Sequence, residues 1–191
     1  MPDTIRTFIA VEIPKNIISD IRDLQQDLKA YGVDIRWIRP ENIHLTLKFL
    51  GDVPAADMDS IFRVISRTAE GGSPISLQAK GIGVFPGVKR PRILWVGLTG
   101  QLELLSRLQK TLDSNLKGIA FSPEKRPFKG HLTIGRIKTK MNSKIFVDAL
   151  MAFRSFESET FIADRIVLFK SELKPNGAEY TDLASATLGC P

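Results

Sequence analysis

Apolar residues along the chain follow two spacings in turn, one with a period near 2 and one with a period near 3.6. The first spacing is typical of a half-buried strand and the second of an amphipathic helix, so the pattern predicts an α+β protein. Strands are expected over residues 7–13, 33–38 and 44–50, and helices over residues 15–30 and 55–70. Glycines and a proline within residues 71–74 end the second helix.

The same order of elements returns in the second half of the chain. Strands are expected over 91–98 and 131–137, and helices over 102–116 and around 146–153. A shift of 87 residues places these elements on those of the first half. Two hairpins complete the pattern, with turns at Pro86-Gly87 and Pro175-Asn176-Gly177. A repeat this long is unlike a solenoid, and we expect one bilobal domain over residues 1–191 with two pseudo-symmetric lobes.

The best match between the two halves surrounds the only two histidines. Each histidine follows an Arg-Pro pair at the same spacing and precedes Leu, Thr and an aliphatic residue. Side chains alternate across a strand, so His44 shares a face with Thr46, and His131 with Thr133, while the aliphatic residues face the core. If the lobes face each other, both His/Thr pairs line one central cleft.

Two imidazoles in one cleft suit acid–base chemistry. Their ordinary pKa near 6.5 allows one to act as a base and the other as an acid at neutral pH. Threonine hydroxyls can donate hydrogen bonds to the nonbridging oxygens of a phosphate. The pattern therefore predicts hydrolysis of a phosphodiester without a metal. The residues alone leave open which histidine is the acid.

Composition limits the other possibilities. The formal net charge of +6 favours a polyanionic partner such as RNA. The lone cysteine, Cys190, can close no intrachain disulfide, and no GxxxxGK[ST] loop is present to hold ATP. No run of about 20 apolar residues would cross a bilayer. We expect a cytoplasmic monomer with no membrane span, no metal and no cofactor.

Nearly the whole chain resembles the two-histidine HxTx phosphoesterases. Within them it is similar to the bacterial and archaeal RNA 2',3'-cyclic phosphodiesterases, long called 2'-5' RNA ligases. The segments that carry the resemblance are Arg6–Ala10, Arg36-Trp37, His44–Gly51, Gly83–Pro86, Pro91–Val96, Arg126–Phe128, His131–Arg136, Leu168–Leu173 and Gly177–Tyr180. The resemblance implies two antiparallel-sheet lobes flanked by helices around a cleft. It also implies opening of a terminal RNA 2',3'-cyclic phosphate to a 2'-phosphate, and 2'-5' joining of RNA ends without ATP.

The same resemblance assigns roles around the cleft. It makes His44 the proton donor and His131 the proton acceptor, and it makes Arg136 a clamp on phosphate. Strict alternation puts Arg136 on the face opposite His131, unless a bulge at Gly135 turns it back. Otherwise Arg136 is a surface residue. Lys129, which with the following glycine departs from the expected Arg-Pro, predicts a looser turn before the second histidine.

Other candidate contacts are Lys48, Tyr180 and Phe8. Lys48 shares the parity of His44 along its strand, so it either reaches the same groove or is an exposed strand-end lysine. Tyr180 and Phe8 could stack on a base, although core packing is the commoner role of such aromatics.

Two groups of basic residues lie in predicted loops. They either form a positively charged surface that binds an RNA backbone, or they are only solvent-exposed loop residues. Their residues are Lys89, Arg90, Arg92, Lys125, Arg126 and Lys129. The alternative functions are action on a small nucleotide, such as a cyclic phosphate of ADP-ribose, and noncatalytic RNA binding. A metal site made from the two histidines and carboxylates is a further alternative.

Overall fold

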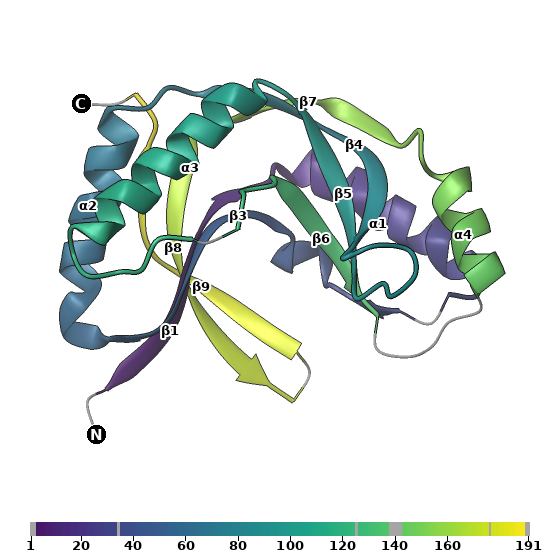
Figure 1. Ribbon diagram of the computed structural model, residues 1–191, viewed down its shortest axis with the longest axis horizontal. Helices are drawn as coiled ribbons and strands as arrows, with labels where there is room; N and C mark the ends of the chain where they lie inside the picture. The colour runs from purple at the N-terminus through teal and green to yellow at the C-terminus, as the bar shows by residue number, and fades with distance from the viewer. Residues whose placement is uncertain (1–2, 34, 125, 138–142, 176, 190–191) are drawn as a thin grey trace.

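Antiparallel pairing joins the strands into one sheet in the computed structural model, which describes residues 3–33, 35–124, 126–137, 143–175 and 177–189 (Figure 1). Lys125, Asn176 and Cys190 lie outside the described residues. The strands are β1 (Thr4–Glu12), β2 (Arg36–Trp37), β3 (His44–Pro54), β4 (Ile75–Phe85), β5 (Ile93–Gly100), β6 (His131–Arg136), β7 (Glu157–Ala163), β8 (Arg165–Lys174) and β9 (Gly177–Thr187). The helices are α1 (Lys15–Ala30), α2 (Met58–Glu70), α3 (Leu102–Lys117) and α4 (Ser143–Ala152), with 3-10 turns η1 (Pro40–Asn42) and η2 (Ala55–Asp57).

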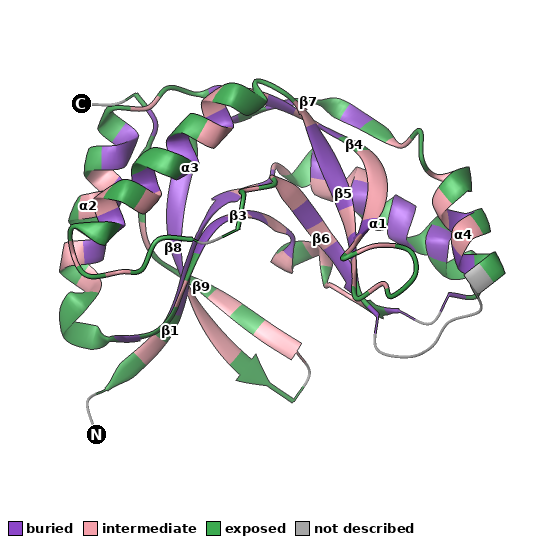
Figure 2. Ribbon diagram, in the orientation of Figure 1, coloured by how far each residue is buried: buried purple, intermediate pink, exposed green. Residues whose placement is uncertain are grey.

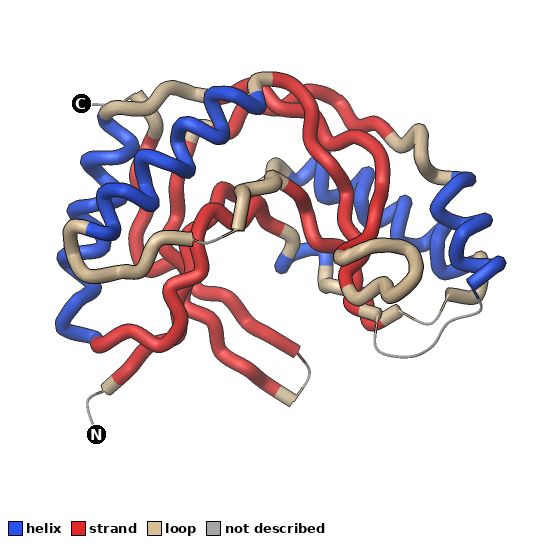
Figure 3. The backbone as a smooth tube through the Cα atoms, viewed as in Figure 1, coloured by secondary structure: helices blue, strands red, loops and turns tan. Residues whose placement is uncertain are grey.

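The strand order is symmetric about the centre of the sheet. It runs β7-β4-β5-β6-β3-β1-β8-β9, with β2 added beside β6. The two central strands, β6 and β3, each begin with a histidine and pair through a single register match, Leu45 with Leu132. Figure 3 shows the halves of the sheet on either side of this junction, with helices flanking each half. The predicted α+β fold with two pseudo-symmetric lobes is confirmed, and the two lobes share one continuous sheet.

The helices cross between the lobes. Helix α1 follows β1, yet it packs beside the other half of the sheet, where Tyr31 just beyond its end contacts Phe153 at 5.7 Å between ring centroids. Helix α3 follows β5, yet it lies against α2 (Figure 1). Each lobe therefore contains elements from both halves of the chain.

Helix boundaries follow from local chemistry. The apolar stripe of α1, Ile17, Ile21, Leu24 and Leu28, is buried against the sheet, as its spacing predicts. The chain leaves this helix through Gly32 at a φ of +70°, a left-handed conformation that glycine adopts without strain. Figure 2 shows buried positions concentrated in the sheet and on the helix faces turned toward it.

Two strands differ from the sequence prediction. Strand β2 is only two residues long, and β7 has no counterpart among the predicted elements. The apolar pattern of β7 is weak because one of its inward positions is a buried serine, Ser158, which donates to the Glu159 carbonyl and accepts from the Ala79 N–H. In the described part of the chain, every helix is too short or too polar to span a bilayer.

Candidate active site

The two histidines lie on adjacent strands and on one face of the sheet. Because Leu45 pairs with Leu132 in antiparallel register, each histidine lies opposite the threonine of the other strand. Both leucines are fully buried on the core face, and their polar neighbours are half-buried on the opposite face. The register thus brings together the four predicted side chains, His44, Thr46, His131 and Thr133.

The register places the four side chains at the corners of one small quadrilateral. Directly opposed side chains of an antiparallel pair have Cβ atoms about 4.5–5.5 Å apart, and diagonal neighbours about 7–8 Å apart. His44 and His131 occupy one diagonal and the threonines the other. The rings are close enough to interact, since the charge of His131 contributes to lowering the pKa of His44.

Both imidazoles are held in the same way. Nδ1 of His44 lies 2.8 Å from the carbonyl oxygen of Asn42, and Nδ1 of His131 lies 2.7 Å from that of Lys129. A carbonyl oxygen only accepts hydrogen bonds, so Nδ1 carries the proton in each ring. Nε2 is then the atom that can take or give a proton. Residues 126–130 form no 3-10 turn like the one over Pro40–Asn42 before His44, in line with the looser turn expected from Lys129-Gly130, although both segments make the same contact to their imidazole.

Aromatic side chains enclose His44. Phe8 stacks on its ring at 4.6 Å, and Tyr180 meets it edge-on at 5.3 Å. These rings belong to a second apolar cluster, with Phe169, on the site face of β1 and β8. Burial lowers the pKa of His44 to about 4, partly opposed by the hydrogen bond to Asn42. Phe8 itself is buried, so its face supports the imidazole and is not free to stack on a base.

The surroundings of His131 differ. Phe85 meets its ring edge-on at 5.0 Å, and Phe85 in turn packs against Trp95 at 5.2 Å. Trp95 pairs with Thr133 across β5 and β6. This side of the site is therefore also lined by aromatic rings, which come from the β4–β5 hairpin.

A bulge turns Arg136 to the site face. Opposite β5, Thr133 pairs with Trp95, whereas Gly135 pairs with Leu94 and Arg136 with Ile93, so one residue of β6 is extra. Arg136 therefore faces the same way as Thr133, and it is exposed. The charge of Arg136 acts on Tyr180. Burial raises the pKa of the Tyr180 hydroxyl, and the charges of Arg136 and Arg6 partly oppose this rise.

The matching bulge in β3 has two consequences. Thr46 pairs with Ala10, but Lys48 pairs with Ile9 and Phe49 with Phe8, so one residue of β3 is extra. The bulge reverses the parity of Lys48, which is buried on the core face and ion-paired with Asp113. The prediction that Lys48 reaches the groove of His44, or is an exposed strand-end residue, is therefore wrong.

Phe49 lies on the face of β3 that strict alternation assigned to Lys48, because the bulge shifts the pairing by one residue. It is the fifth residue after its histidine, as Arg136 is in the other strand. Its side chain is 69% exposed and lies 6.0 Å from the Phe8 ring. Sequence reasoning missed Phe49, although the equal spacing in the two repeats was a signal that could have found it.

A cavity of about 670 Å³ adjoins His44. It is lined by Lys15 and Arg22 of α1, Glu41 of η1, and Tyr180 of β9, among others. The predicted basic residues Lys89, Arg90, Arg92, Arg126 and Lys129 are all exposed. Within the described ranges, no three His, Cys, Asp or Glu side chains are placed to hold a metal ion.

Comparison with known proteins gives consistent results. A family model described as LigT-like phosphoesterase matches the chain twice, over residues 11–95 and 96–180. The RNA 2',3'-cyclic phosphodiesterase of Methanothermobacter thermautotrophicus is 32% identical, with 94% of this chain and 96% of that protein covered. That of Methanocaldococcus jannaschii is 34% identical, with coverages of 92% and 96%.

Solved structures are similar in fold. TT0787 of Thermus thermophilus has a TM-score of 0.79 at 24% identity, covering 96% of this chain and 98% of that one. Escherichia coli LigT complexed with 3'-AMP has a TM-score of 0.77 at 21% identity, with coverages of 97% and 99%.

Proposed function

Since this chain belongs to the LigT-like phosphoesterase family, we propose that it hydrolyses the terminal 2',3'-cyclic phosphate of RNA to a 2'-phosphomonoester. The pairing of each histidine with the threonine of the opposite strand carries this proposal. It supplies two proton-transfer groups and two hydroxyl donors around one phosphate-sized space. The names of the relatives at over 30% identity support the same activity.

In the proposed mechanism, His131 and His44 act on opposite sides of phosphorus. Nε2 of His131 takes a proton from water, whose oxygen forms a new bond to phosphorus. The bond from phosphorus to the 3'-oxygen breaks in line, and Nε2 of His44 gives that oxygen a proton. Thr46 and Thr133 donate hydrogen bonds to the nonbridging oxygens, where negative charge accumulates in the transition state.

The low pKa of His44 fits this cycle once substrate is bound. In the empty site, burial keeps the ring neutral at pH 7. A phosphodiester carries a negative charge, and an opposite charge beside a ring favours its protonated form. Binding of the substrate therefore supplies the charge that lets His44 act as the acid.

Two residues that the bulges turn to the site face, Arg136 and Phe49, contact the phosphate and the base of the substrate. Arg136 contacts the phosphate, and a guanidinium suits that role because its donors match phosphate geometry. Phe49 offers an exposed face on which a base can stack. Tyr180 forms a wall of the site beside His44.

Ligation uses the same groups in the same roles. A 5'-hydroxyl of a second RNA takes the place of water: Nε2 of His131 takes its proton, and its oxygen bonds to phosphorus. The bond to the 3'-oxygen breaks, and Nε2 of His44 gives that oxygen a proton, which leaves a 2'-5' linkage without ATP.

The test uses an oligonucleotide that ends in a 2',3'-cyclic phosphate, assayed in EDTA. We expect release of a 2'-phosphomonoester, and His44→Gln and His131→Gln should each lower kcat by about 10²–10⁴. Unchanged turnover in either variant would falsify the proposal. Loss of activity in EDTA, restored by a divalent metal, would contradict metal independence.

The alternatives are separated by two comparisons. Equal kcat/KM for a cyclic mononucleotide and an oligonucleotide would favour a small nucleotide as the substrate. Salt-dependent RNA binding without turnover, unchanged in the histidine variants, would favour a noncatalytic RNA-binding module.

A further inference from the structure

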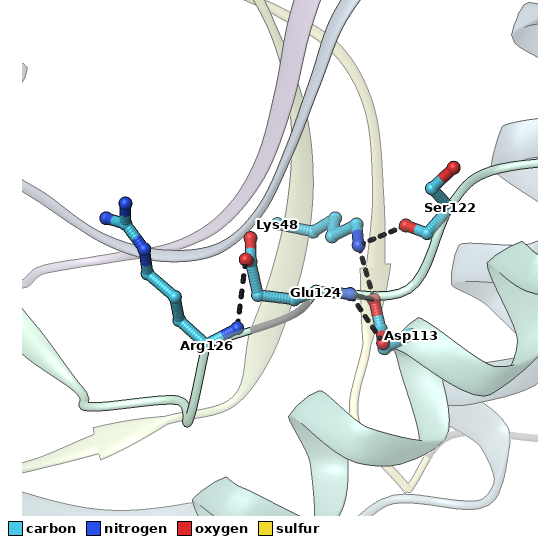
Figure 4. Close-up of polar contacts among 5 residues, drawn as sticks. All are labelled: Lys48, Asp113, Ser122, Glu124 and Arg126. Carbon is cyan, nitrogen blue, oxygen red and sulfur yellow. Dashed lines mark hydrogen bonds and ion pairs between the residues drawn. The ribbon is translucent and has the colours of Figure 1, made fainter.

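A buried ion pair joins the strand of one histidine to the segment that precedes the other. Nζ of Lys48 lies 2.5 Å from Oδ1 of Asp113 and donates to the Ser122 carbonyl at 2.8 Å. The Asp113 carboxylate accepts the backbone N–H of Glu124, at 3.1 Å to Oδ2. The side chains of Lys48 and Asp113 are only 6% and 16% exposed. Figure 4 shows these contacts converging between β3, α3 and the chain after Ser122.

The residues held by this pair, Ser122 and Glu124, precede His131 by nine and seven positions. Glu124 is held by Asp113 of α3, and Gly130 packs so closely on the same helix that an added Cβ would lie 3.0 Å from Leu105. Lys129, whose carbonyl oxygen holds Nδ1 of His131, comes between these two anchors. The position of that carbonyl therefore depends on where α3 holds the segment.

A second polar side chain makes the corresponding connection in the other lobe. Gln25 of α1 is buried, and its Nε2 donates to the carbonyls of Ile38 and Ile134, each at 2.9 Å. Ile38 precedes His44 by six residues, and Ile134 lies in the strand of His131. In each lobe, a helix thus ties the approach to one histidine to the strand of the other.

We propose that Lys48 and Asp113 are positioning residues for His131, and that Gln25 has the same role for His44. Each connection holds in place the carbonyl that fixes the tautomer of its histidine, and it also sets the distance between the two histidine strands. A charged pair costs desolvation when it is buried, so packing alone does not explain its place here. The effect on turnover rests on the proposed function, whereas the effect on the rings does not.

The tautomer of each ring is read by long-range ¹H–¹⁵N NMR at about pH 8.5, above the ordinary imidazole pKa. Because the chain has two histidines, the spectrum contains two ring systems. In the wild-type protein, both rings should show a protonated Nδ1. Lys48→Met with Asp113→Leu, which removes both charges together, should populate the other tautomer in His131 and not in His44. Gln25→Met should populate the other tautomer in His44 and not in His131.

Kinetics give a second readout. The kcat of the Lys48→Met/Asp113→Leu variant should fall by about 10–100-fold, because a small misplacement of the His131 ring has an effect of this size on the rate. The matched control is Lys80→Met with Glu157→Leu. It removes an ion pair whose side chains are 47% and 46% exposed, and it should change neither the tautomers nor kcat.

A milder pair of variants covers the case in which the buried substitutions prevent folding. Glu124→Pro removes the backbone N–H that Asp113 accepts, whereas Glu124→Ala keeps it. Only Glu124→Pro should change the His131 tautomer. Wild-type tautomers in Glu124→Pro, or equal changes at both histidines in every variant, would overturn the proposal. Because NMR needs no substrate, this result stands even if the wild-type protein fails to hydrolyse a cyclic phosphate.

Discussion

Leu45 of β3 pairs with Leu132 of β6 across the centre of the sheet, and among the described residues this is the only register match between these strands. Both side chains are fully buried, so the match is fixed by the core. A slip of one residue would send the histidines and threonines to the opposite face. The site therefore depends on core packing at the junction of the lobes.

The threonines should contribute equally. Thr46→Val and Thr133→Val keep the shape of the side chain and remove its donor, so each should lower kcat by about 10²–10³ if the hydroxyl stabilises the transition state. Single-turnover assays on the cyclic-phosphate oligonucleotide measure this effect. Thr160→Val, at an exposed position in β7, is the control and should behave as wild type. A change in KM alone would instead assign the hydroxyls to ground-state binding.

His44 should titrate far below an ordinary histidine. Its burial, reinforced by the charge of His131, lowers its pKa to about 4. An NMR titration of the free protein should show this value, and the acid limb of kcat/KM should fall near the same pH. In His131→Gln the pKa of His44 should rise, because one of the lowering effects is removed. A His44 pKa near 6.5 in the wild-type protein would contradict the observed burial.

The same burial makes stability depend on pH. Because the pKa of His44 is about 4 in the folded protein against 6.5 in the unfolded chain, the unfolded chain binds more protons between these values. The stabilisation is complete above pH 6.5 and is lost as pH falls toward 4, by about 3 kcal/mol in the free energy of unfolding. Urea unfolding at several pH values measures the loss, and His44→Gln should reduce it. An unchanged pH slope in that variant would show that other groups cause it.

Gly135→Ala should mimic the loss of Arg136. A Cβ at Gly135 would lie 2.5 Å from Cγ2 of Ile35, so either Ile35 or the bulge that directs Arg136 to the site must move. Arg136→Met removes a charge-assisted contact and should raise KM, by about 10-fold for a contact of about 1.5 kcal/mol. Gly135→Ala should raise KM in the same direction. A wild-type KM for Gly135→Ala would show that Arg136 does not depend on the bulge.

The basic β4–β5 loop should matter only for long substrates. Lys89, Arg90 and Arg92 are exposed, and a protein that touches fewer phosphates binds RNA with a weaker dependence on salt. Replacing all three with alanine should raise KM for an oligonucleotide and flatten its dependence on salt. The KM for a cyclic mononucleotide should stay the same. Equal effects on both substrates would argue against an RNA footprint on this loop.

The sequence by itself determined most of the elements and the site's central residues. The period of the apolar positions is a local property of helices and strands, so it predicts α1 with its observed bounds and the paired strands of both hairpins. The repeat at 87 residues pairs His44 with His131, and alternation puts each threonine on the face of its histidine.

Only the tertiary structure decided the residues around that centre. Parity counting assumes that every residue of a strand has a partner, but a bulge exists only relative to the neighbouring strand. The bulges in β3 and β6 bury Lys48, expose Phe49 and turn Arg136 to the site. Likewise, the pairing of Lys48 with Asp113 joins residues 65 positions apart, through a helix that crosses to the other lobe. Such contacts depend on how the lobes pack, which no local pattern in the chain specifies.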